Sequence, residues 1–156
     1  MIKIGIIGLG VMGAIFAKSL ERYTEAKLTA VSDINATLAH QFAEKYGINE
    51  YTDYDRMLQE VELDAVLICT PDQYHLAPVQ SACKANVHIF IEKPLATDSQ
   101  SAKEILALAQ NYKKTFMVGH TLRFDPRFAN AYNSIARHEI GEILHIRSWR
   151  ETSIDN

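Results

Sequence analysis

Short apolar runs alternate along this chain with stretches in which apolar residues recur at helical spacing. The runs are rich in aliphatic and β-branched residues, which is typical of strands buried on both faces. They cover residues 3–7, 28–32, 65–69, 87–91 and 115–118, with a short edge strand expected at 51–52. Helices are expected between them, at 36–46, at 54–60, up to Ala85, and from Thr97 or Asp98 to Asn111. The alternation predicts an α/β fold, a doubly wound parallel sheet with strand order 3-2-1-4-5-6.

The tail of the chain departs from this alternation. Asp125 and Pro126 indicate the start of a helix, since proline favours the first helical position. Residues 143–149 then alternate between apolar and polar side chains like a half-buried strand, although a strand without a partner is not stable. We therefore expect residues 1–120 to form one complete domain and residues 121–156 to be the beginning of a truncated second domain. Pairing of the tail across a dimer is the alternative.

A glycine-rich loop follows the first expected strand. It reads Gly8-Leu9-Gly10-Val11-Met12-Gly13, a G-x-G-x-x-G sequence, and an amphipathic helix comes after it. Gly8 permits a tight turn, Gly10 lets a pyrophosphate approach the backbone, and Gly13 lets the helix pack closely on the strand. The start of that helix offers free N–H groups and a positive dipole end to the phosphates. The sequence therefore predicts a dinucleotide-binding loop, and a purely structural turn is the alternative.

Asp33 ends the second expected strand, 25 residues after Gly8. At this distance a carboxylate is placed to accept hydrogen bonds from the adenosine ribose hydroxyls. Its charge would repel the 2′-phosphate of NADP, and the neighbouring Ile34 and Asn35 carry no cation to balance one. We therefore expect NAD as the cofactor, in preference to NADP.

Charge and composition exclude several other classes of function. The 156 residues carry a net charge of −3 without a basic block, so nucleic acid is not an expected partner. Cys69 and Cys83 match no metal or redox spacing, and we expect buried thiols, a reducing compartment and no metal site. The N-terminus has no signal peptide and no apolar run approaches the ~20 residues that cross a bilayer, which indicates a cytoplasmic protein without membrane contact.

Taken together, the motifs resemble those of the Gfo/Idh/MocA family, named after glucose–fructose oxidoreductase and inositol dehydrogenase. The resemblance covers the entire chain, and its most specific part is Glu92-Lys93-Pro94-Leu95-Ala96. The other parts are the glycine loop, Cys69-Thr70-Pro71 with His75 four residues after the proline, and Gly119-His120 followed by Arg123-Phe124-Asp125-Pro126.

The resemblance implies a two-domain NAD(P)-dependent oxidoreductase, about twice this length, that acts on CH–OH groups of a sugar-, cyclitol- or polyol-like substrate. The second domain would be an α+β domain that holds the substrate and often builds a homo-oligomer. The family's lysine carries over to Lys93, near the nicotinamide and the substrate hydroxyl. The other catalytic groups of the family, commonly an Asp and a His, lie on a later helix that residues 1–156 do not reach. The chain alone is therefore expected to be inactive.

Individual residues carry further expectations. A cation beside the substrate oxygen stabilises alkoxide character, which suits Lys93, whereas pairing with Glu92 or simple solvation is the alternative. The Lys93–Pro94 bond is expected to be cis. Thr70 and Pro71 are expected against the nicotinamide ribose, or else to form only a strand-ending turn.

The remaining candidates are less specific. His75 is a candidate for the cofactor side, with a helix-capping or surface role equally open. Glu92 is a further candidate cofactor contact, and His120 and Arg123 are candidates for contact with the substrate.

Two other functions compete with a polyol dehydrogenase. One is a nonenzymatic NAD-binding module that senses redox state or regulates a partner. The other is a different Rossmann enzyme with another second domain, against which the sequence Glu92-Lys93-Pro94-Leu95-Ala96 argues.

Overall fold

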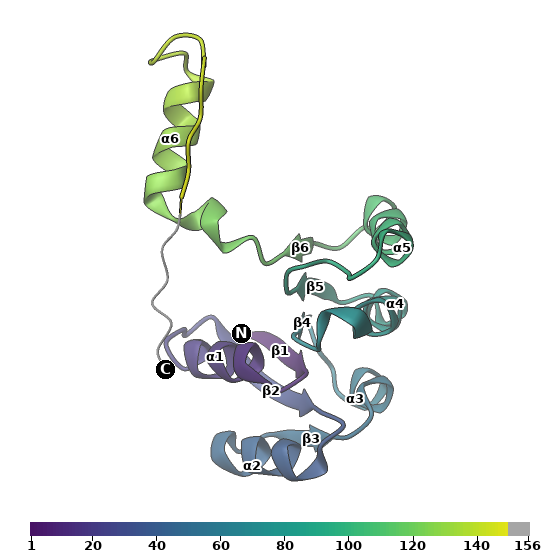
Figure 1. The fold of residues 1–156 in the computed structure, drawn as a ribbon. Helices are drawn as coiled ribbons and strands as arrows, with labels where there is room; N and C mark the ends of the chain where they lie inside the picture. The colour runs from purple at the N-terminus through teal and green to yellow at the C-terminus, as the bar shows by residue number, and fades with distance from the viewer. Residues whose placement is uncertain (150–156) are drawn as a thin grey trace, which may run out of the picture. The chain divides into compact units, whose positions relative to one another are not determined.

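A parallel sheet runs through the first of two units, Met1–Gly119, of the computed structural model. The structure describes residues 1–149, so residues 150–156 of the expected second domain lie outside the described residues. The six strands are β1 (Ile2–Ile7), β2 (Ala26–Ser32), β3 (Asn49–Tyr51), β4 (Ala65–Ile68), β5 (His88–Ile91) and β6 (Phe116–Val118). Their order is β3-β2-β1-β4-β5-β6 and every neighbouring pair is parallel, which confirms the predicted fold class (Figure 1).

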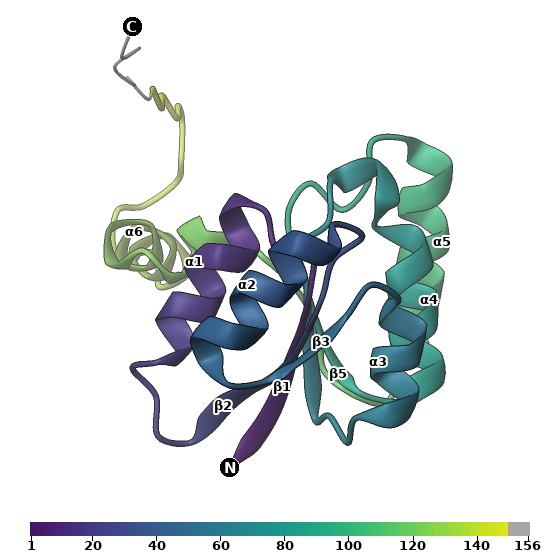
Figure 2. The same cartoon turned by 90° about the horizontal axis from the view of Figure 1, so that it is seen from below.

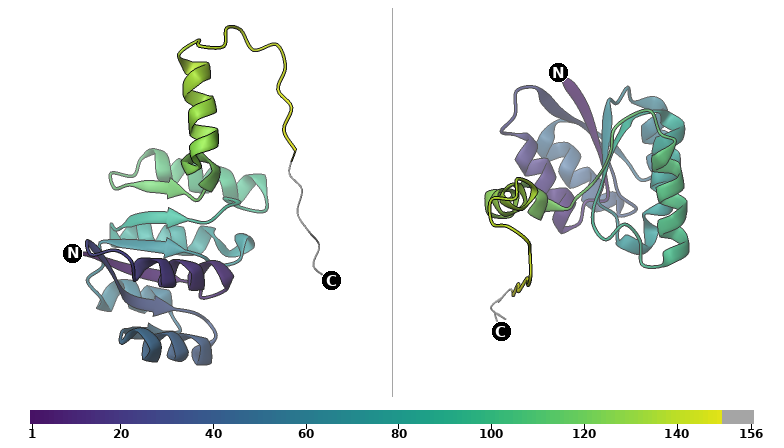
Figure 3. Two further views of the ribbon diagram at one scale, coloured as in Figure 1. Left: turned by 90° about the vertical axis from the view of Figure 1, so that its left-hand side faces the viewer. Right: turned by 90° about the horizontal axis from the view of Figure 1, so that it is seen from above.

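Helices cover both faces of this sheet. They are α1 (Val11–Leu20), α2 (Ala36–Tyr46), α3 (Tyr54–Glu60), α4 (Leu76–Ala85) and α5 (Ser99–Gln110). Helices α1 and α2 lie on one face, and α3, α4 and α5 lie on the other (Figure 2). Seen from the side, the strands succeed one another with the helices in layers alongside them (Figure 3, left). No helix among residues 1–149 is long and apolar enough to cross a membrane.

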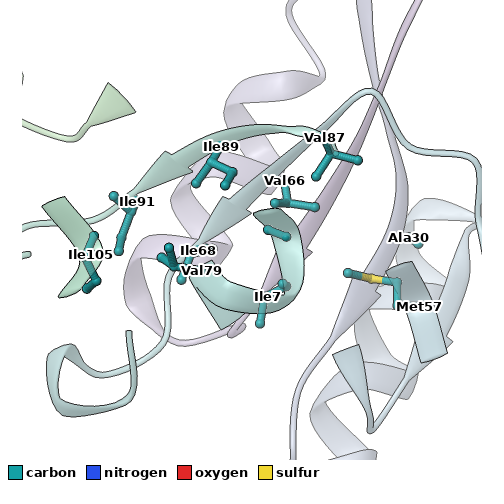
Figure 4. Close-up of a cluster of buried hydrophobic side chains, with 11 residues drawn as sticks. Ile7, Ala30, Met57, Val66, Ile68, Val79, Val87, Ile89, Ile91 and Ile105 are labelled. Atoms are coloured by element: carbon teal, nitrogen blue, oxygen red, sulfur yellow. The ribbon is translucent and has the colours of Figure 1, made fainter. Parts of the chain in front are cut away.

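Neighbouring strand residues point into two separate apolar cores. Ile6 belongs to the core beneath α1 and α2, whereas Ile7 belongs to the core beneath α3, α4 and α5. In the second core, Met57 and Ile105 reach from the helices toward the strands (Figure 4). Burying such side chains contributes roughly 1.5–3 kcal/mol each. Continuous apolar runs therefore predict the strands of this sheet, since both faces of each strand need apolar side chains.

Hydrogen-bonding side chains set where the helices begin. The Asp98 carboxylate accepts a hydrogen bond from the Ser101 N–H at 2.8 Å, so Asp98 rather than Thr97 caps α5. Pro78 lies in the first turn of α4, where its missing N–H costs no helical bond. The edge strand begins at Asn49, earlier than the expected 51–52.

The second unit begins at His120. It contains a 3-10 turn, Thr121–Phe124 (η2), and helix α6, Pro126–Ala136, which Asp125 caps through its hydrogen bond from the Arg127 N–H at 2.9 Å. The strand expected at 143–149 is wrong, because these residues form no regular structure and Leu144 is 93% exposed. Alternation of side chains is a local pattern, whereas a strand also needs a neighbour to bond.

Candidate cofactor site

The glycine loop joins β1 to α1 in a shape that only glycine permits. Gly8 has a φ of 91°, and a Cβ there would lie 2.7 Å from the backbone carbon of Cys69 and the nitrogen of Thr70. A Cβ at Gly13 would collide with the Gly8 carbonyl oxygen. A Cβ at Gly10 would meet nothing within 4 Å, so the backbone there is open to a ligand. Gly10 also caps α1 without a side-chain hydrogen bond, which leaves the N–H groups of the first turn for an anion.

The carboxylate of Asp33 holds this loop against the end of β2. One of its oxygens accepts a hydrogen bond from the Leu9 N–H at 2.7 Å, and the other accepts one from the Asn35 N–H at 2.9 Å. Each carboxylate oxygen has a second lone pair, so the group remains able to accept hydrogen bonds from ribose hydroxyls. The contact with Leu9 is a role that the sequence did not predict, since the spacing of the motif shows only that Asp33 and the loop share one edge of the sheet.

Two buried oxygens at this edge have no hydrogen-bond partner among the described residues. They are the hydroxyl oxygen of Thr70, just beyond β4, and Oε1 of Glu92, just beyond the neighbouring strand β5. Glu92 is only 6% exposed, and its other oxygen accepts a hydrogen bond from the Lys93 N–H at 3.0 Å. A buried polar group without a partner costs about 1–3 kcal/mol, so each of these two oxygens is a candidate to accept a hydrogen bond from a ligand that reaches it.

Gly119 closes the same edge at the end of β6. Its N–H donates to the Ile91 carbonyl at 2.8 Å. A Cβ at this position would lie 2.9 Å from the ring of Phe90 and 3.3 Å from Oε1 of Glu92. The absence of a side chain at Gly119 therefore leaves the space that the Glu92 carboxylate occupies.

Lys93 is exposed directly beyond the buried Glu92. The Lys93–Pro94 peptide bond is cis, as predicted. The ion pairs found within residues 1–149 do not include Lys93, so the alternative of a pair with Glu92 finds no support there. The lysine amine is thus a candidate for contact with a ligand at this edge.

His75 lies immediately before α4 and is buried, with 1% of its surface exposed. Its Nε2 lies 3.0 Å from the Thr70 carbonyl oxygen and its Nδ1 lies 3.2 Å from the Leu95 carbonyl oxygen. The ring makes no helix-capping hydrogen bond. The surface role left open by the sequence is therefore wrong, because the ring is buried between two loops. His75 does occupy the N-cap position of α4, but it caps the helix with its backbone carbonyl and not with its ring.

The thiols differ in burial. Cys69 is buried, and burial together with the charge of Glu92 raises its pKa to about 12. Cys83 is only partly buried, and burial raises its pKa as well. A thiol with a raised pKa is a poor nucleophile, so neither cysteine is a candidate catalytic group. Residues 1–149 contain no cluster of three or more His, Cys, Asp or Glu side chains able to hold a metal ion.

His120 and Arg123, the candidates for substrate contact, belong to the second unit. Both side chains are exposed, and the Arg123 N–H donates to the His120 carbonyl at 3.0 Å within η2. The first unit thus brings together the loop 8–13, Asp33, Thr70, Glu92 and Lys93 at the carboxyl ends of its strands, where α/β sheets bind ligands.

Comparisons with known proteins agree with this geometry. A sequence model of the GFO_IDH_MocA family, described as an oxidoreductase family with an NAD-binding Rossmann fold, matches residues 2–120. The chain is 34% identical over 138 residues to an uncharacterized oxidoreductase of Bacillus subtilis and 32% identical over 142 residues to the inositol 2-dehydrogenase of Rhizobium meliloti. These matches cover 88% and 91% of this chain but 40% and 43% of the relatives, so the chain spans less than half of their length.

A solved structure of a dehydrogenase is also similar to this chain. The scyllo-inositol dehydrogenase from Lactobacillus casei, crystallised with bound cofactor NAD(H) and scyllo-inositol, matches with a TM-score of 0.85 at 30% identity. The match covers 91% of this chain and 43% of that one. The chain therefore belongs to the Gfo/Idh/MocA oxidoreductase family, as its motifs predicted, and residues 2–120 are its NAD-binding Rossmann domain.

Proposed function

We propose that this chain is the cofactor-binding part of an NAD-dependent dehydrogenase that transfers a hydride between nicotinamide and a CH–OH group of a cyclitol, sugar or similar polyol. One observation carries the proposal. The carboxyl ends of the parallel strands combine a loop that only glycine can form, a carboxylate bonded to that loop, two buried oxygens without partners among residues 1–149, and an exposed lysine that follows one of them in sequence.

The adenosine half of the cofactor would lie over the glycine loop. The open space at Gly10 and the uncapped start of α1 suit a pyrophosphate. Asp33 would accept hydrogen bonds from the ribose hydroxyls with the lone pairs that Leu9 and Asn35 leave free. A carboxylate at this position favours NAD over NADP, because the 2′-phosphate of NADP would meet a like charge.

The nicotinamide half would lie at the ends of β4 and β5. The Thr70 hydroxyl and Oε1 of Glu92 are buried and have no partner among the described residues, so they suit the hydroxyl and amide donors of the nicotinamide riboside. Pro71 fixes the turn after β4 and would contact the ribose with its backbone. Gly119 has no side chain and so leaves room for the Glu92 carboxylate.

Lys93 is the proposed catalytic residue. The bound nicotinamide would accept the hydride from the carbinol carbon of the substrate. Lys93 would place its cation beside the substrate oxygen and so stabilise the alkoxide character that develops as the hydroxyl proton passes to a general base of the second domain. Because Lys93 is exposed, its amine can contact a substrate that approaches from the solvent.

The proposed substrate class is inferred from the names of the relatives, and part of the substrate contact is assigned to the second domain. Two of the proteins this chain resembles are named inositol dehydrogenases, and one of them was crystallised with scyllo-inositol. His120 and Arg123 are proposed to meet the substrate oxygens in the full-length protein, which we expect to be a homo-oligomer. A nonenzymatic NAD-binding module finds no support, since the relatives reported above are named oxidoreductases or dehydrogenases.

The full-length protein tests the reaction directly. Reduction of NAD⁺, followed by absorbance at 340 nm, is expected with at least one of scyllo-inositol, myo-inositol, glucose and sorbitol. Lys93→Met is expected to lower kcat by about 100-fold or more while NADH still binds, because only the stabilisation of the alkoxide is lost. Lys84→Met, which removes an exposed lysine at the end of α4, is the matched control. Full activity of Lys93→Met, or NADH binding without turnover of any polyol, would contradict the proposal.

A further inference from the structure

His75 joins two loops that lie far apart in sequence. The first loop follows β4 and contains Thr70, whose carbonyl oxygen is 3.0 Å from Nε2 of the ring. The second follows β5 and contains Leu95, whose carbonyl oxygen is 3.2 Å from Nδ1. The two strands are neighbours in the sheet, so the buried ring bridges the gap between their loops at the edge where ligands bind.

The backbone of His75 is itself held in place. Its N–H donates to the Asp72 carbonyl at 3.4 Å, and its carbonyl accepts a hydrogen bond from the Val79 N–H at 3.2 Å in the first turn of α4. The ring is therefore carried by a rigid helix start rather than by a free loop. A polar ring is costly to bury unless it is hydrogen-bonded, so the two carbonyl contacts account for its place in the interior.

The chemistry of imidazole limits what these contacts can be. A neutral ring has one N–H and donates to one of the two carbonyls at a time, whereas the imidazolium donates to both. In either form no ring nitrogen is left for a cofactor. An effect of His75 on the cofactor must therefore pass through the two loops.

Both loops carry proposed contacts with the nicotinamide half of the cofactor. Thr70 offers a buried hydroxyl that has no partner within residues 1–149, and Lys93 lies two residues before Leu95. We propose that His75 is a positioning residue whose ring fixes the distance between these loops, and with it the distance between the groups that receive the nicotinamide riboside. This inference rests on the proposed function, and it assigns to His75 no contact with the adenosine half, which belongs to the glycine loop and Asp33.

The nicotinamide half is thus assigned to the two loops that His75 joins, and the adenosine half to the glycine loop and Asp33. Comparing two ligands tests this assignment. NADH contains the nicotinamide riboside and ADP lacks it, while both share the adenosine half and the pyrophosphate. His75→Leu removes both ring nitrogens and is expected to weaken NADH binding by about tenfold and ADP binding by less than about twofold, measured by calorimetric titration. His75→Gln retains a donor near the position of Nε2 and His75→Asn retains one near Nδ1, so each is expected to recover part of the loss.

Val79→Ala is the matched control. Val79 is fully buried one turn further along α4 and its side chain bonds neither loop, so the substitution lowers the thermal midpoint without a preference between the two ligands. Equal losses for NADH and ADP in the His75 variants would overturn the inference. Unchanged affinity for both ligands, with only a lower thermal midpoint, would overturn it as well.

Amide hydrogen exchange separates this inference from the proposed function. In the protein without ligand, exchange at residues 92–96 is expected to be faster in His75→Leu than in Val79→Ala, because the Leu95 carbonyl loses its contact with the imidazole ring. Failure of the unmodified protein to bind NADH would refute the proposed function but leave this test of the bridge in place. Exchange at 92–96 that does not differ between the two variants would overturn the bridge itself.

Discussion

The carboxylate of Asp33 accepts backbone hydrogen bonds from Leu9 in the glycine loop and from Asn35 before α2. The same group is proposed to bind the ribose of the cofactor. A residue that holds the loop and also contacts the ligand couples the shape of the site to its affinity. One substitution then removes both the hydrogen bond to the loop and the contact with the ligand.

Substitution of Asp33 tests this coupling. Asp33→Ala is expected to weaken NADH binding by about tenfold or more, since hydrogen bonds to a charged group contribute ~1.5–3 kcal/mol. Asp33→Asn keeps an acceptor for the Leu9 N–H but removes the charge, so it is expected to bind NADPH better relative to NADH. Fluorescence titration with both nucleotides measures these changes. An unchanged NADH affinity in Asp33→Ala would show that the ribose contact is wrong.

Two glycines of the loop provide a matched pair of substitutions. Gly8→Ala places a Cβ 2.7 Å from the backbone beyond β4 at a φ of 91°, and we expect it to destabilise the fold by at least about 1–3 kcal/mol in urea unfolding. Gly10→Ala enters open space and is expected to leave stability unchanged while weakening NADH binding, since the new methyl group occupies the place of the pyrophosphate. Equal stability of the two variants would contradict the strain at Gly8, and unaltered NADH binding by Gly10→Ala would contradict the position of the pyrophosphate.

Residue identity predicted the glycine loop and Lys93 as candidates, but it could not predict every contact. The partners of His75 are backbone carbonyls 5 and 20 residues away in sequence, and any residue type supplies a carbonyl. The oxygens of Thr70 and Glu92 that have no partner in the described part of the chain could not be predicted either, because their burial follows only once β4, β5 and β6 lie side by side.

At the scale of elements, the strands and helices follow local patterns wherever both faces of the sheet are covered. The strands around Val66 and Ile89 were predicted because buried strands need unbroken apolar runs. The helix at 54–60 was predicted with the bounds that the structure shows. The edge strand β3 begins earlier in the sequence than expected, because its residues are partly exposed and their apolar pattern is weaker. The strand expected at 143–149 failed because alternation does not supply the neighbour that a strand must bond.

Helix α5 offers a pH-dependent test at this scale. Hydrogen bonds from the Ser101 backbone and side chain lower the pKa of Asp98 below its ordinary value. A carboxyl with a lowered native pKa stabilises the fold above its unfolded pKa, and this contribution is lost as the pH falls through the native pKa. Asp98→Ala is therefore expected to lower the thermal midpoint by a few degrees at pH 7, with the difference from the unmodified protein vanishing in strong acid. A difference that persisted in strong acid would mean that the charged cap is not its cause.

For the whole molecule, the strand order was predictable because right-handed crossovers between parallel strands leave few arrangements of alternating elements. The order β3-β2-β1-β4-β5-β6 brings the loops after β1, β2, β4, β5 and β6 to one edge. Residues separated by more than eighty positions in sequence, such as Gly8 and Lys93, thereby contribute to one site. The function proposed for that edge depends on this convergence more than on any single motif.

A side-by-side titration of residues 1–156 with NADH and NADPH, followed by nicotinamide fluorescence, tests the central claim most directly. The account predicts saturable binding of NADH and clearly weaker binding of NADPH, because Asp33 accepts the ribose hydroxyls and repels a 2′-phosphate. A preference for NADPH would contradict the role given to Asp33. Binding of neither nucleotide would contradict the claim that the edge formed by the loop 8–13, Asp33, Thr70 and Glu92 is a working cofactor site.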